Sequence, residues 1–576
     1  MNRLKKTAAL VLTFTMVAAM VPQSAEAAKK KVKLDKKTVT VTVGKTVKLK
    51  LKNNKKKVKW TVISGKKNVS LSKKGKISVT IKGKKAGKAK VQAKIGKKKY
   101  VCKVTVKNKQ KAKSVKKTPA APDSNTGTAA GTKPGSSTPT ATPLPTASTE
   151  EPTKGPSENS KDAKNLKEII AKQREAGATV SEDLQSDEYM WDGDYLTGIL
   201  YWSERKLTGT LDLSCFDHLE RVNCYLNQLS ELDVTKCSSL KSLDCVANQL
   251  SELDVSKCPS LKELECDSNQ LSELDVTKCP SLEKLYCGNN QLSELDVTKC
   301  PSLKDLYCVN NQLSELDVTK CPSLKDLFCM NNQLSKLDIS KCPGLEYLSC
   351  WNNQLSELDV TKCPSLKDLS CKSNQLSKLD VTKCPSLEEL ECESNQLSKL
   401  DVTKCPSLTD LYCSNNQLSE LDVTKCSSLE DLYCSNNQLS ELDVTQCPSL
   451  GWLYCDSNQL SKLDVTQCPS LRWLYCDSNQ LNKLDVTKCL SLEKLYCDDN
   501  KLGNLDVSKC LSLEELSCGS NQLSELDVTK CPSLRRLYCS NNQISELDVS
   551  NCTKLTKLSC GANVTVIGYT GEIERI

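Results

Sequence analysis

Hydrophobic residues recur along most of this chain at an interval of 21 residues, without a single insertion. The leading leucine of each unit first stands at Leu219 and last at Leu555, so seventeen units begin and the last is incomplete. Each unit reads LxxLxCxxNxLxxLDVxxC. Apolar residues at positions four and six alternate with polar residues at positions three and five, which predicts a short strand with one buried side. An unbroken period of this kind predicts a solenoid of stacked units.

In the N-terminal part of the chain, apolar and polar residues alternate, which is typical of β-strands that bury one face. In TVTVTVGKTVKLKLK, two runs of alternating valine or leucine and polar residues flank Gly44. Further runs of the same kind follow as far as Val106. Their length and spacing predict a small all-β sandwich over residues 28–107.

Three other segments complete the organisation of the chain. Residues 1–27 combine a basic start, an apolar run too short to span a bilayer and an Ala-Glu-Ala cleavage pattern, which predicts a signal peptide. Residues 108–160 are rich in Thr, Ser and Pro and predict a disordered linker. Residues 161–218 begin with helical spacing and end in a degenerate repeat, which predicts a cap for the open end of the solenoid; residues 219–576 hold the repeats and a C-terminal cap.

Two parts of this sequence resemble known families. The stretches KLDKKTVTVTVGKTVKLKLK, VKW and GKKAGKAKVQAKIGKKKYVCKVTV resemble the bacterial immunoglobulin-like domain, group 2, over residues 30–107. That resemblance implies an extracellular spacer or adhesion module without a defined ligand. The pattern LxxLxCxxNxL, over roughly residues 200–570, resembles the leucine-rich repeat with Cys in its third apolar slot. This second resemblance implies a solenoid of about 17 repeats of 21 residues, with a parallel sheet on its concave face.

The leucine-rich repeat resemblance also implies a role for the asparagine at position nine. In that family its side chain satisfies backbone groups in the turn after each strand, so a ladder is expected that includes Asn227, Asn248, Asn269, Asn290, Asn311 and Asn332. The plan of signal peptide, Ig-like module and solenoid looks like that of bacterial surface proteins such as internalins. The repeat length, the module order and the lack of a recognised wall-sorting signal differ from that group, so an internalin's receptor function is not carried over.

Nearly all of the 35 cysteines belong to the repeats, seventeen at position six and sixteen at position nineteen. Both positions are predicted core slots, where a free thiol packs as a small hydrophobe. We therefore expect two ladders of buried thiols, exemplified by Cys308, Cys321, Cys329 and Cys342. Disulfides across the core are the first alternative, although side chains in register point in parallel and disfavour bridges between neighbours. Zinc is the second, although no CxxC motif occurs.

Charge divides the chain into two opposite parts. Residues 29–119 contain 35 lysines and one acidic residue, a net charge of +34, whereas residues 120–576 carry −25. Such a distribution bears on partners rather than on fold. An anionic cell-wall polymer is the expected partner of the basic part, because its lysines lack the interleaved aromatics of a nucleic-acid-binding surface. Nucleic acid is not expected.

The sequence contains no recognisable catalytic constellation. His218 is the single histidine and has no nucleophile arranged around it, and no calcium loop or glycine-rich phosphate loop occurs. A structural or surface role for His218 is the simpler interpretation. No metal, no cofactor and no enzymatic activity are expected.

The outward positions three and five are where the repeats differ from one another, and they supply the candidate ligand site. Position five is aromatic in consecutive units, while position three becomes tryptophan in two adjacent units after a run of acids. Contact surfaces are enriched in Trp and Tyr, although aromatics also suit strands without any ligand. The predicted binding residues are Trp452, Tyr454, Trp473, Tyr475, Tyr433, Tyr496, Tyr412, Asp410 and Asp431.

These observations predict a secreted, cell-surface-associated binding protein that is held non-covalently to the cell wall. Its solenoid is expected to mediate protein–protein interaction or adhesion, while the basic Ig-like domain holds an anionic envelope. A carbohydrate ligand is an alternative, because Trp and Tyr also stack on sugars. A structural, wall-organising protein without a specific ligand is another.

Overall fold

A computed structural model describes residues 33–34, 38–43, 46–52, 58–72, 78–95, 98–107 and 156–576. The predicted signal peptide and nearly all of the predicted linker lie outside the described residues. The chain divides into two compact units, one within residues 1–143 and one within residues 144–576. In the part of the chain that the structure describes, no helix has the length and apolarity needed to cross a membrane.

The N-terminal unit contains two four-stranded sheets. One has the order β1-β3-β6-β5 and the other β2-β8-β7-β4, with β2 and β8 parallel and the remaining pairs antiparallel. Buried side chains from both sheets, among them Leu49, Trp60, Val91 and Cys102, form one hydrophobic core. The alternating valines and leucines therefore do supply a buried side. The strand bounds are β1 Lys33–Leu34, β2 Thr38–Thr42, β3 Thr46–Lys52, β4 Lys59–Ser64, β5 Val69–Ser72, β6 Ser78–Gly83, β7 Gly87–Ile95 and β8 Lys98–Lys107.

The second unit begins with a helix, α2 (Lys161–Glu175), that closes the N-terminal end of the solenoid. Ser160 caps the helix, because its hydroxyl accepts a hydrogen bond from the Ala163 amide at 3.1 Å. Asp162 in the first turn is buried and accepts a bond from the Leu196 amide at 3.0 Å. The neighbouring strands are β9 (Tyr189–Asp192), β10 (Tyr195–Ile199) and β11 (Thr208–Asp212), and β11 pairs in parallel with β13 (Gln228–Asp233).

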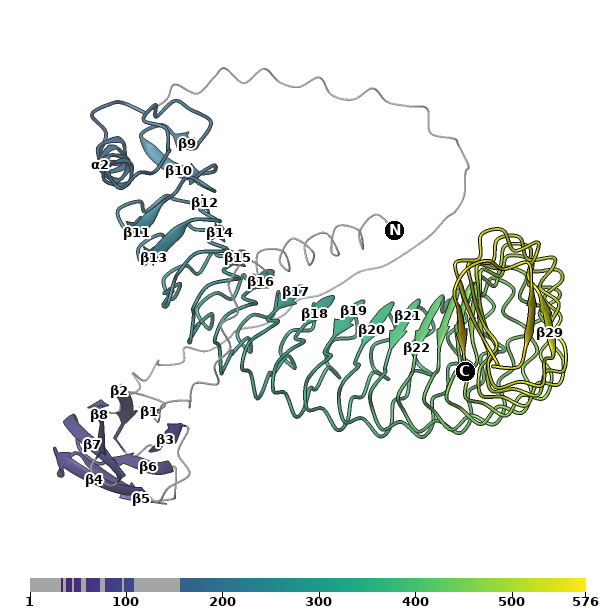
Figure 1. Ribbon diagram of the computed structural model, residues 1–576. Coiled ribbons are helices and arrows are strands. Elements are labelled where there is room, and N and C mark those ends of the chain that lie inside the picture. The colour runs from purple at the N-terminus through teal and green to yellow at the C-terminus, as the bar shows by residue number, and fades with distance from the viewer. Residues whose placement is uncertain are drawn as a thin grey trace, which may run out of the picture. The chain divides into compact units, whose positions relative to one another are not determined.

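One long sheet follows the solenoid from β9 through β10 to β32, and each repeat contributes one short parallel strand to it. Figure 1 shows these strands side by side along the inner, concave side of the curved solenoid. The register is constant, since residues 21 apart lie opposite each other in consecutive strands. The strands are β12 Arg221–Asn223, β14 Ser242–Asp244, β15 Glu263–Glu265, β16 Lys284–Tyr286, β17 Asp305–Tyr307, β18 Asp326–Phe328, β19 Tyr347–Ser349, β20 Asp368–Ser370, β21 Glu389–Glu391, β22 Asp410–Tyr412, β23 Asp431–Tyr433, β24 Trp452–Tyr454, β25 Trp473–Tyr475, β26 Lys494–Tyr496, β27 Glu515–Ser517, β28 Arg536–Tyr538, β30 Lys557–Cys560 and β32 Ile573–Arg575.

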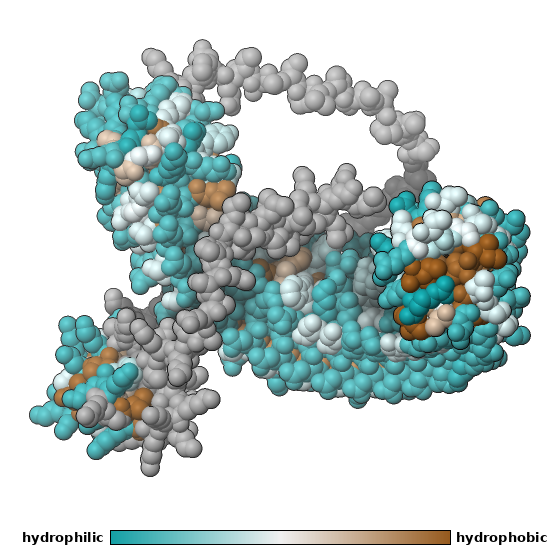
Figure 2. Space-filling model, viewed as in Figure 1, coloured by the Kyte–Doolittle hydropathy of each residue, from teal (hydrophilic) through white to brown (hydrophobic). Residues whose placement is uncertain are grey.

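The core of the solenoid is formed by the leucine, valine and cysteine positions of every repeat. In the repeat that begins at Leu303, the side chains of Leu306, Cys308 and Val318 are all 0% exposed. The solenoid of about 18 turns confirms the predicted leucine-rich architecture. At its C-terminal end, β31 (Thr565–Ile567) pairs with β29 (Glu546–Asp548), and hydrophobic side chains gather on this end in Figure 2.

Each strand leaves the sheet through a residue in the left-handed region of backbone space, at position eight of the repeat. Its φ lies between 49° and 59° in units from Leu226 to Asn541. Asparagine and serine occupy most of these positions, and asparagine tolerates this conformation better than other side chains. Asn289, Asn310, Asn331 and Asn352 also bond to one another side chain to side chain, at 2.6 to 2.7 Å. The turn is therefore itself a stacked structure.

Candidate ligand-binding face of the solenoid

Three parallel rows of side chains line the concave sheet. Row three runs from Arg221 to Lys557, and row five runs from Asn223 to Ser559; both lie on the strands and alternate with the buried leucine and cysteine. Row seven, from Tyr225 to Gly561, follows the buried cysteine at position six. Because the register is constant, the neighbours of any residue in a row lie one strand away, at about 4.8 Å.

Row five contains two stacks of aromatic rings. The longer stack joins five tyrosines on consecutive strands, with ring centroids 4.3 to 4.8 Å apart and interplanar angles of 6° to 30°: Tyr412, Tyr433, Tyr454, Tyr475 and Tyr496. The shorter stack is less regular: Tyr307 stacks on Phe328 at 4.4 Å with an interplanar angle of 12°, whereas Tyr286 meets Tyr307 edge to face at 4.5 Å and 70°. Contacts between these aromatic rings stabilise the sheet by more than the burial of their apolar surface alone.

Row three changes character beside the longer stack. The run of acids ends at Asp431, and the next two strands carry Trp452 and Trp473, whose rings stack at 5.3 Å with an interplanar angle of 23°. The ammonium of Lys494 lies 4.6 Å from the Trp473 ring centroid, which is a cation–π contact. Trp473 also donates from Nε1 to Glu493 Oε2 at 3.4 Å. Both tryptophans are half-buried.

Stacking covers the faces of most of these rings. Tyr433, Tyr454 and Tyr475 each have a neighbouring ring against both faces. Trp473 lies between Trp452 and the Lys494 ammonium. A partner therefore meets ring edges and hydroxyl groups. Since sugars stack on ring faces, this arrangement is poorly suited to a stacked carbohydrate ligand.

The hydroxyl groups of the longer stack form a line that ends at a carboxylate. The hydroxyls of Tyr454 and Tyr475 hydrogen-bond along the stack, and Tyr496 donates to Glu515 Oε2 at 2.6 Å. Glu515 also pairs with Arg536 at 2.5 Å and with Lys494 at 3.6 Å. Burial raises the pKa of Tyr454 to about 12, so its hydroxyl stays protonated at neutral pH.

Carboxylates crowd the rest of the concave face. Burial, reinforced by neighbouring acids, raises the pKa of Glu265 to about 7 and that of Glu389 to about 7. The same causes raise the pKa of Asp368 to about 6. Burial and the adjacent Asp410 raise the pKa of Asp431 to about 7. Proximity of like charges in a partly desolvated surface is the common physical reason.

This crowding predicts a solenoid that is more stable in mild acid than in mild base. Carboxyl groups such as those of Glu265, Glu389 and Asp431 bind their protons more tightly in the folded state than in the unfolded state. The free energy of unfolding that they contribute therefore falls as pH rises from about 4 through about 7. After a discount for partial exposure, each group contributes roughly 1 kcal/mol. The exposed aspartates of the LDV motif, such as Asp296, have a lowered pKa, and their stabilisation is already complete above pH 5. We expect the unfolding midpoint, measured by circular dichroism, to be higher at pH 5.5 than at pH 8.0, with a smaller difference in Glu389→Gln/Asp431→Asn. A midpoint that rises with pH contradicts this expectation.

The position-nine asparagines form a ladder behind the concave face. Asn311 Oδ1 accepts from the Leu292 amide at 2.9 Å, and Nδ2 donates to the carbonyls of Cys287, Cys308 and Val309 at 3.0 to 3.2 Å. The same bonds recur through the predicted positions Asn227, Asn248, Asn269, Asn290 and Asn332 and onward to Asn542. Each side chain thus joins two repeats.

The repeat thiols lie in the core as two rows. Cys308, Cys321, Cys329 and Cys342 are 0% exposed, and the structure contains these cysteines as free thiols. The position-nineteen thiols donate to backbone carbonyls of the preceding repeat, as Cys321 does to the Val297 carbonyl at 3.5 Å. Burial raises the pKa of Cys308 to about 12 and that of Cys321 to about 12.

We expect these thiols to resist chemical labelling in the folded protein. The thiolate is the reactive form, and both solvent exclusion and a raised pKa suppress it. With maleimide at pH 7.5 and without reductant, few of the 33 repeat cysteines of the sequence should react, whereas urea should expose most of them. Cys215, which is only half-buried, should react first. Mass spectrometry counts the labels, and a chain that is fully disulfide-bonded before reduction would overturn the expectation.

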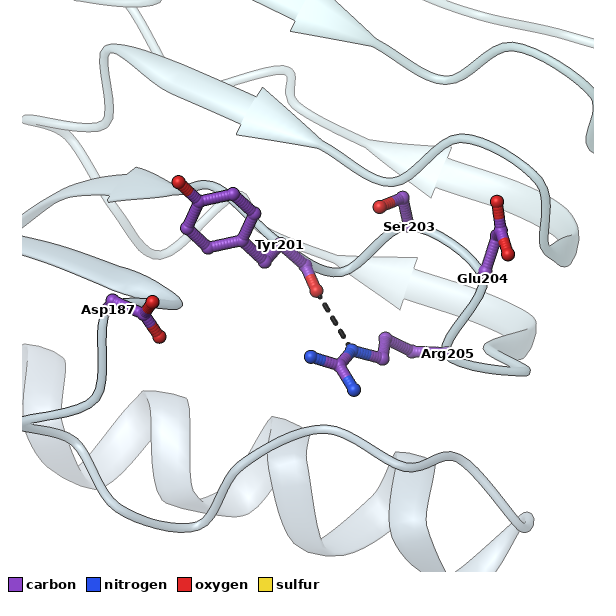
Figure 3. A pocket seen from close by; sticks show the side chains of 5 residues that line it. All are labelled: Asp187, Tyr201, Ser203, Glu204 and Arg205. Carbon is purple, nitrogen blue, oxygen red and sulfur yellow. Dashed lines mark hydrogen bonds between the residues drawn. The ribbon is translucent and has the colours of Figure 1, made fainter.

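The cap contains a hollow that the repeat pattern did not predict. Asp187, Tyr201, Ser203, Glu204 and Arg205 line a volume of about 470 Å³, and Figure 3 shows the Arg205 guanidinium turned toward the Tyr201 carbonyl, to which it donates at 3.0 Å. The guanidinium also donates to Glu188 at 2.7 Å. The positive charge of Arg205 is therefore paired within the cap.

The single histidine of the sequence lies where the cap meets the repeats. His218 is exposed and stacks on Tyr195, with centroids 4.0 Å apart. No group of three or more potential metal ligands occurs among the described residues.

The predicted binding residues lie together on the concave face. The five tyrosines form the longer stack, the two tryptophans lie beside it, and Asp410 and Asp431 precede the tryptophans in row three. Sequence reasoning missed Glu515, Lys494 and Glu493, which hold the ends of both aromatic groups. Glu515 and Lys494 stand at position three and Glu493 at position two of the units that follow the aromatic residues, and this placement could have indicated the contacts.

Comparisons with known proteins match the repeats. The family described as "Leucine Rich repeats (2 copies)" matches residues 259–299, 301–342, 343–384, 385–425, 406–446, 511–548 and 532–566. A comparison with curated proteins finds no match.

Several solved structures are similar to the solenoid. The functional domain of InlJ from Listeria monocytogenes, described as including a cysteine ladder, is 34% identical, with a TM-score of 0.54 over 57% of this chain and 74% of that chain. YopM from Yersinia enterocolitica is 27% identical, with a TM-score of 0.53 over 72% and 97% of the two chains. The plant peptide hormone receptor RGFR1 in complex with RGF2 is 23% identical, with a TM-score of 0.60 over 64% and 67%, and shares the fold alone.

Proposed function

Because the chain belongs to the leucine-rich repeat family and its solenoid is internalin-like, we propose that it is a secreted, non-enzymatic binding protein whose concave sheet holds a protein ligand. The observation that carries the proposal is the aromatic surface of rows three and five. It joins the five-tyrosine stack to the Trp452–Trp473 pair on consecutive strands. Interface cores are enriched in these residue types.

A protein ligand suits this surface better than a glycan. Ring edges and phenolic hydroxyls are presented, while the ring faces are covered by their neighbours. Hydroxyls and edges complement the carbonyl groups and apolar side chains of a polypeptide. RGFR1, which shares the fold, was solved in complex with the peptide hormone RGF2.

The test is retrieval of a ligand by the full mature chain from extracts of host and bacterial surfaces. Retention of a defined protein, competed by the free chain, supports the proposal. Retention of a glycan that survives protease treatment supports the carbohydrate alternative. Retention of nothing above a control solenoid contradicts the proposed function and leaves the structural, wall-organising role.

We propose that residues 28–107 form an Ig-like module that holds the protein to an anionic cell envelope. Support comes from the two four-stranded sheets with a common core and from the net charge of +34 over residues 29–119. In the described strands β7 and β8, the alternate side chains are exposed and many are lysines, such as Lys88, Lys90 and Lys103. Localisation at the cell wall follows from this charge.

Attachment of this kind should depend steeply on salt. Exposed lysines are screened within about 10 Å at 0.1 M salt, and binding to a polyanion releases counterions. We expect retention of the full chain on purified teichoic acid to weaken by at least about 100-fold between 50 and 500 mM NaCl. Sedimentation with isolated cell walls checks the result. Retention that does not change with salt refutes the electrostatic account.

A further inference from the structure

The concave face carries one composite arrangement twice, six repeats apart. Strand β15 and the second residue after it present three half-buried carboxylates, Glu263, Glu265 and Asp267. Strand β21 and the second residue after it present three more in the same rows, Glu389, Glu391 and Glu393. Directly after each triple, row five becomes aromatic, because Glu265 lies opposite Tyr286 and Glu391 lies opposite Tyr412. We call each triple with its following aromatic stack a station. The two stations lie about 29 Å apart along the sheet.

An excess of negative charge surrounds both triples. In rows three, five and seven from β14 to β17, the first station and the strand before it contain five acids and one lysine, Lys284, which pairs with Glu263 at 2.9 Å. The corresponding strands of the second station, β20 to β23, contain six acids and one lysine, Lys372, which pairs with Glu391 at 2.8 Å. The acids are Asp244, Glu263, Glu265, Asp267 and Asp305 in the first, and Asp368, Glu389, Glu391, Glu393, Asp410 and Asp431 in the second.

One carboxylate of each triple is paired with a lysine, Glu263 or Glu391, whereas the other two form no ion pair in the described part of the chain. Neighbouring acids add to the effect of burial on Glu265 and Glu389 and raise the pKa of each to about 7, despite Lys284 and Lys372 nearby. Burial likewise raises the pKa of Asp267 to about 7. A cation brought by a ligand would relieve this repulsion at both stations.

The aromatic stack beside each triple indicates which kind of cation fits there. In the longer stack and between Tyr307 and Phe328, stacking at 4.3 to 4.8 Å covers ring faces and leaves ring edges for a ligand, whereas Tyr286 meets Tyr307 edge to face. A long aliphatic stem can lie along such an edge while its charged end reaches the carboxylates, as lysine and arginine side chains do. A small inorganic cation would leave the aromatic rows unused.

We propose that the two stations bind two basic clusters of one extended polypeptide, with lysine or arginine ends on the carboxylate triples and their stems along the aromatic rows. The proposal rests on the proposed function and names its ligand. An extended chain rises about 3.3 Å per residue, so the spacing corresponds to about nine residues between the centres of the two clusters.

The test uses the full mature chain and fluorescein-labelled peptides. One probe carries two Lys-Arg-Lys clusters separated by about six Gly/Ser residues, so that the cluster centres are about nine residues apart. A second probe carries one cluster, and a third carries none. In fluorescence anisotropy at 150 mM NaCl, we expect the two-cluster peptide to bind at least 10-fold more tightly than the one-cluster peptide. The variant Glu389→Gln/Glu391→Gln/Glu393→Gln should reduce the two-cluster affinity to the one-cluster level.

The matched control removes three charges from exposed positions in the second half of three repeats, Glu252→Gln/Glu273→Gln/Glu294→Gln. It should change the affinity less than 2-fold. An equal loss in this control means that net charge alone drives binding and overturns the proposal, as does equal binding of the two peptides. If neither peptide binds while a surface protein is still retrieved through the aromatic rows, the basic-polypeptide ligand is wrong and the proposed function stands.

Discussion

Replacement of Asn311 by Ala is expected to lower the free energy of unfolding by about 3 kcal/mol, a large effect for one polar side chain. The substitution leaves the Leu292 amide without its acceptor and deprives the carbonyls of Cys287, Cys308 and Val309 of a donor. Asn311 is buried, so water replaces these bonds poorly. Because each repeat contacts mainly its neighbours, the loss should be local. Urea unfolding measures the total, and hydrogen exchange at the Leu292 amide measures its location.

Two further variants separate this effect from general damage. Gln312→Ala changes the adjacent exposed side chain and should cost less than about 0.5 kcal/mol. Asn311→Asp keeps the size but places a carboxylate among three carbonyl oxygens, which raises the folded-state pKa, so its stability should recover as pH falls from 7 to 5. Unchanged exchange at Leu292 in Asn311→Ala would show that the asparagine ladder does not hold the turns.

The regular part of this fold could be predicted because the period is unbroken. When the same residue type returns every 21 positions, stacking in register follows, and so does the burial of Leu306, Cys308 and Val318 in one core. The asparagine positions follow from the same register. Local propensity, hydrophobic pattern and turn residues agree in every unit, which is the condition for a sequence to specify one fold.

The ring contacts and pKa values of the site depend on side-chain geometry, which a repeating sequence pattern does not determine. Outward positions were predictable for Tyr454 and Tyr475, but the covering of their faces follows from ring orientations across three strands. The raised pKa of Glu389 likewise depends on how closely the acids of neighbouring strands approach it. The cap was predicted from its helical spacing and its degenerate repeat, but its internal contacts do not recur with a period, so the ion pair of Arg205 with Glu188 could not be predicted.

The double variant Trp452→Ser/Trp473→Ser should lose at least about 2 kcal/mol of affinity for the retrieved surface protein, roughly 30-fold. Both rings lie on the outward side of consecutive strands, so the solenoid should stay folded without them. Trp473 also holds Lys494 and Glu493, whereas Trp452 has only the stacking contact among the interactions described above. Trp452→Ser alone is therefore the cleaner measure of direct contact. Surface plasmon resonance gives the affinity, and circular dichroism checks the fold.

The acidic residues of row three provide the matched comparison for the tryptophans. Asp368→Ser/Asp410→Ser removes two side chains from the same row, and should mainly slow association at low salt, because charges at a distance steer encounter more than they hold the complex. The tryptophan variant should instead speed dissociation, since well-packed anchors govern the lifetime of a complex. If the tryptophan variant binds as tightly as the parent chain, the stacked rings serve the sheet alone, because an interface anchor cannot be removed without a change in the dissociation rate.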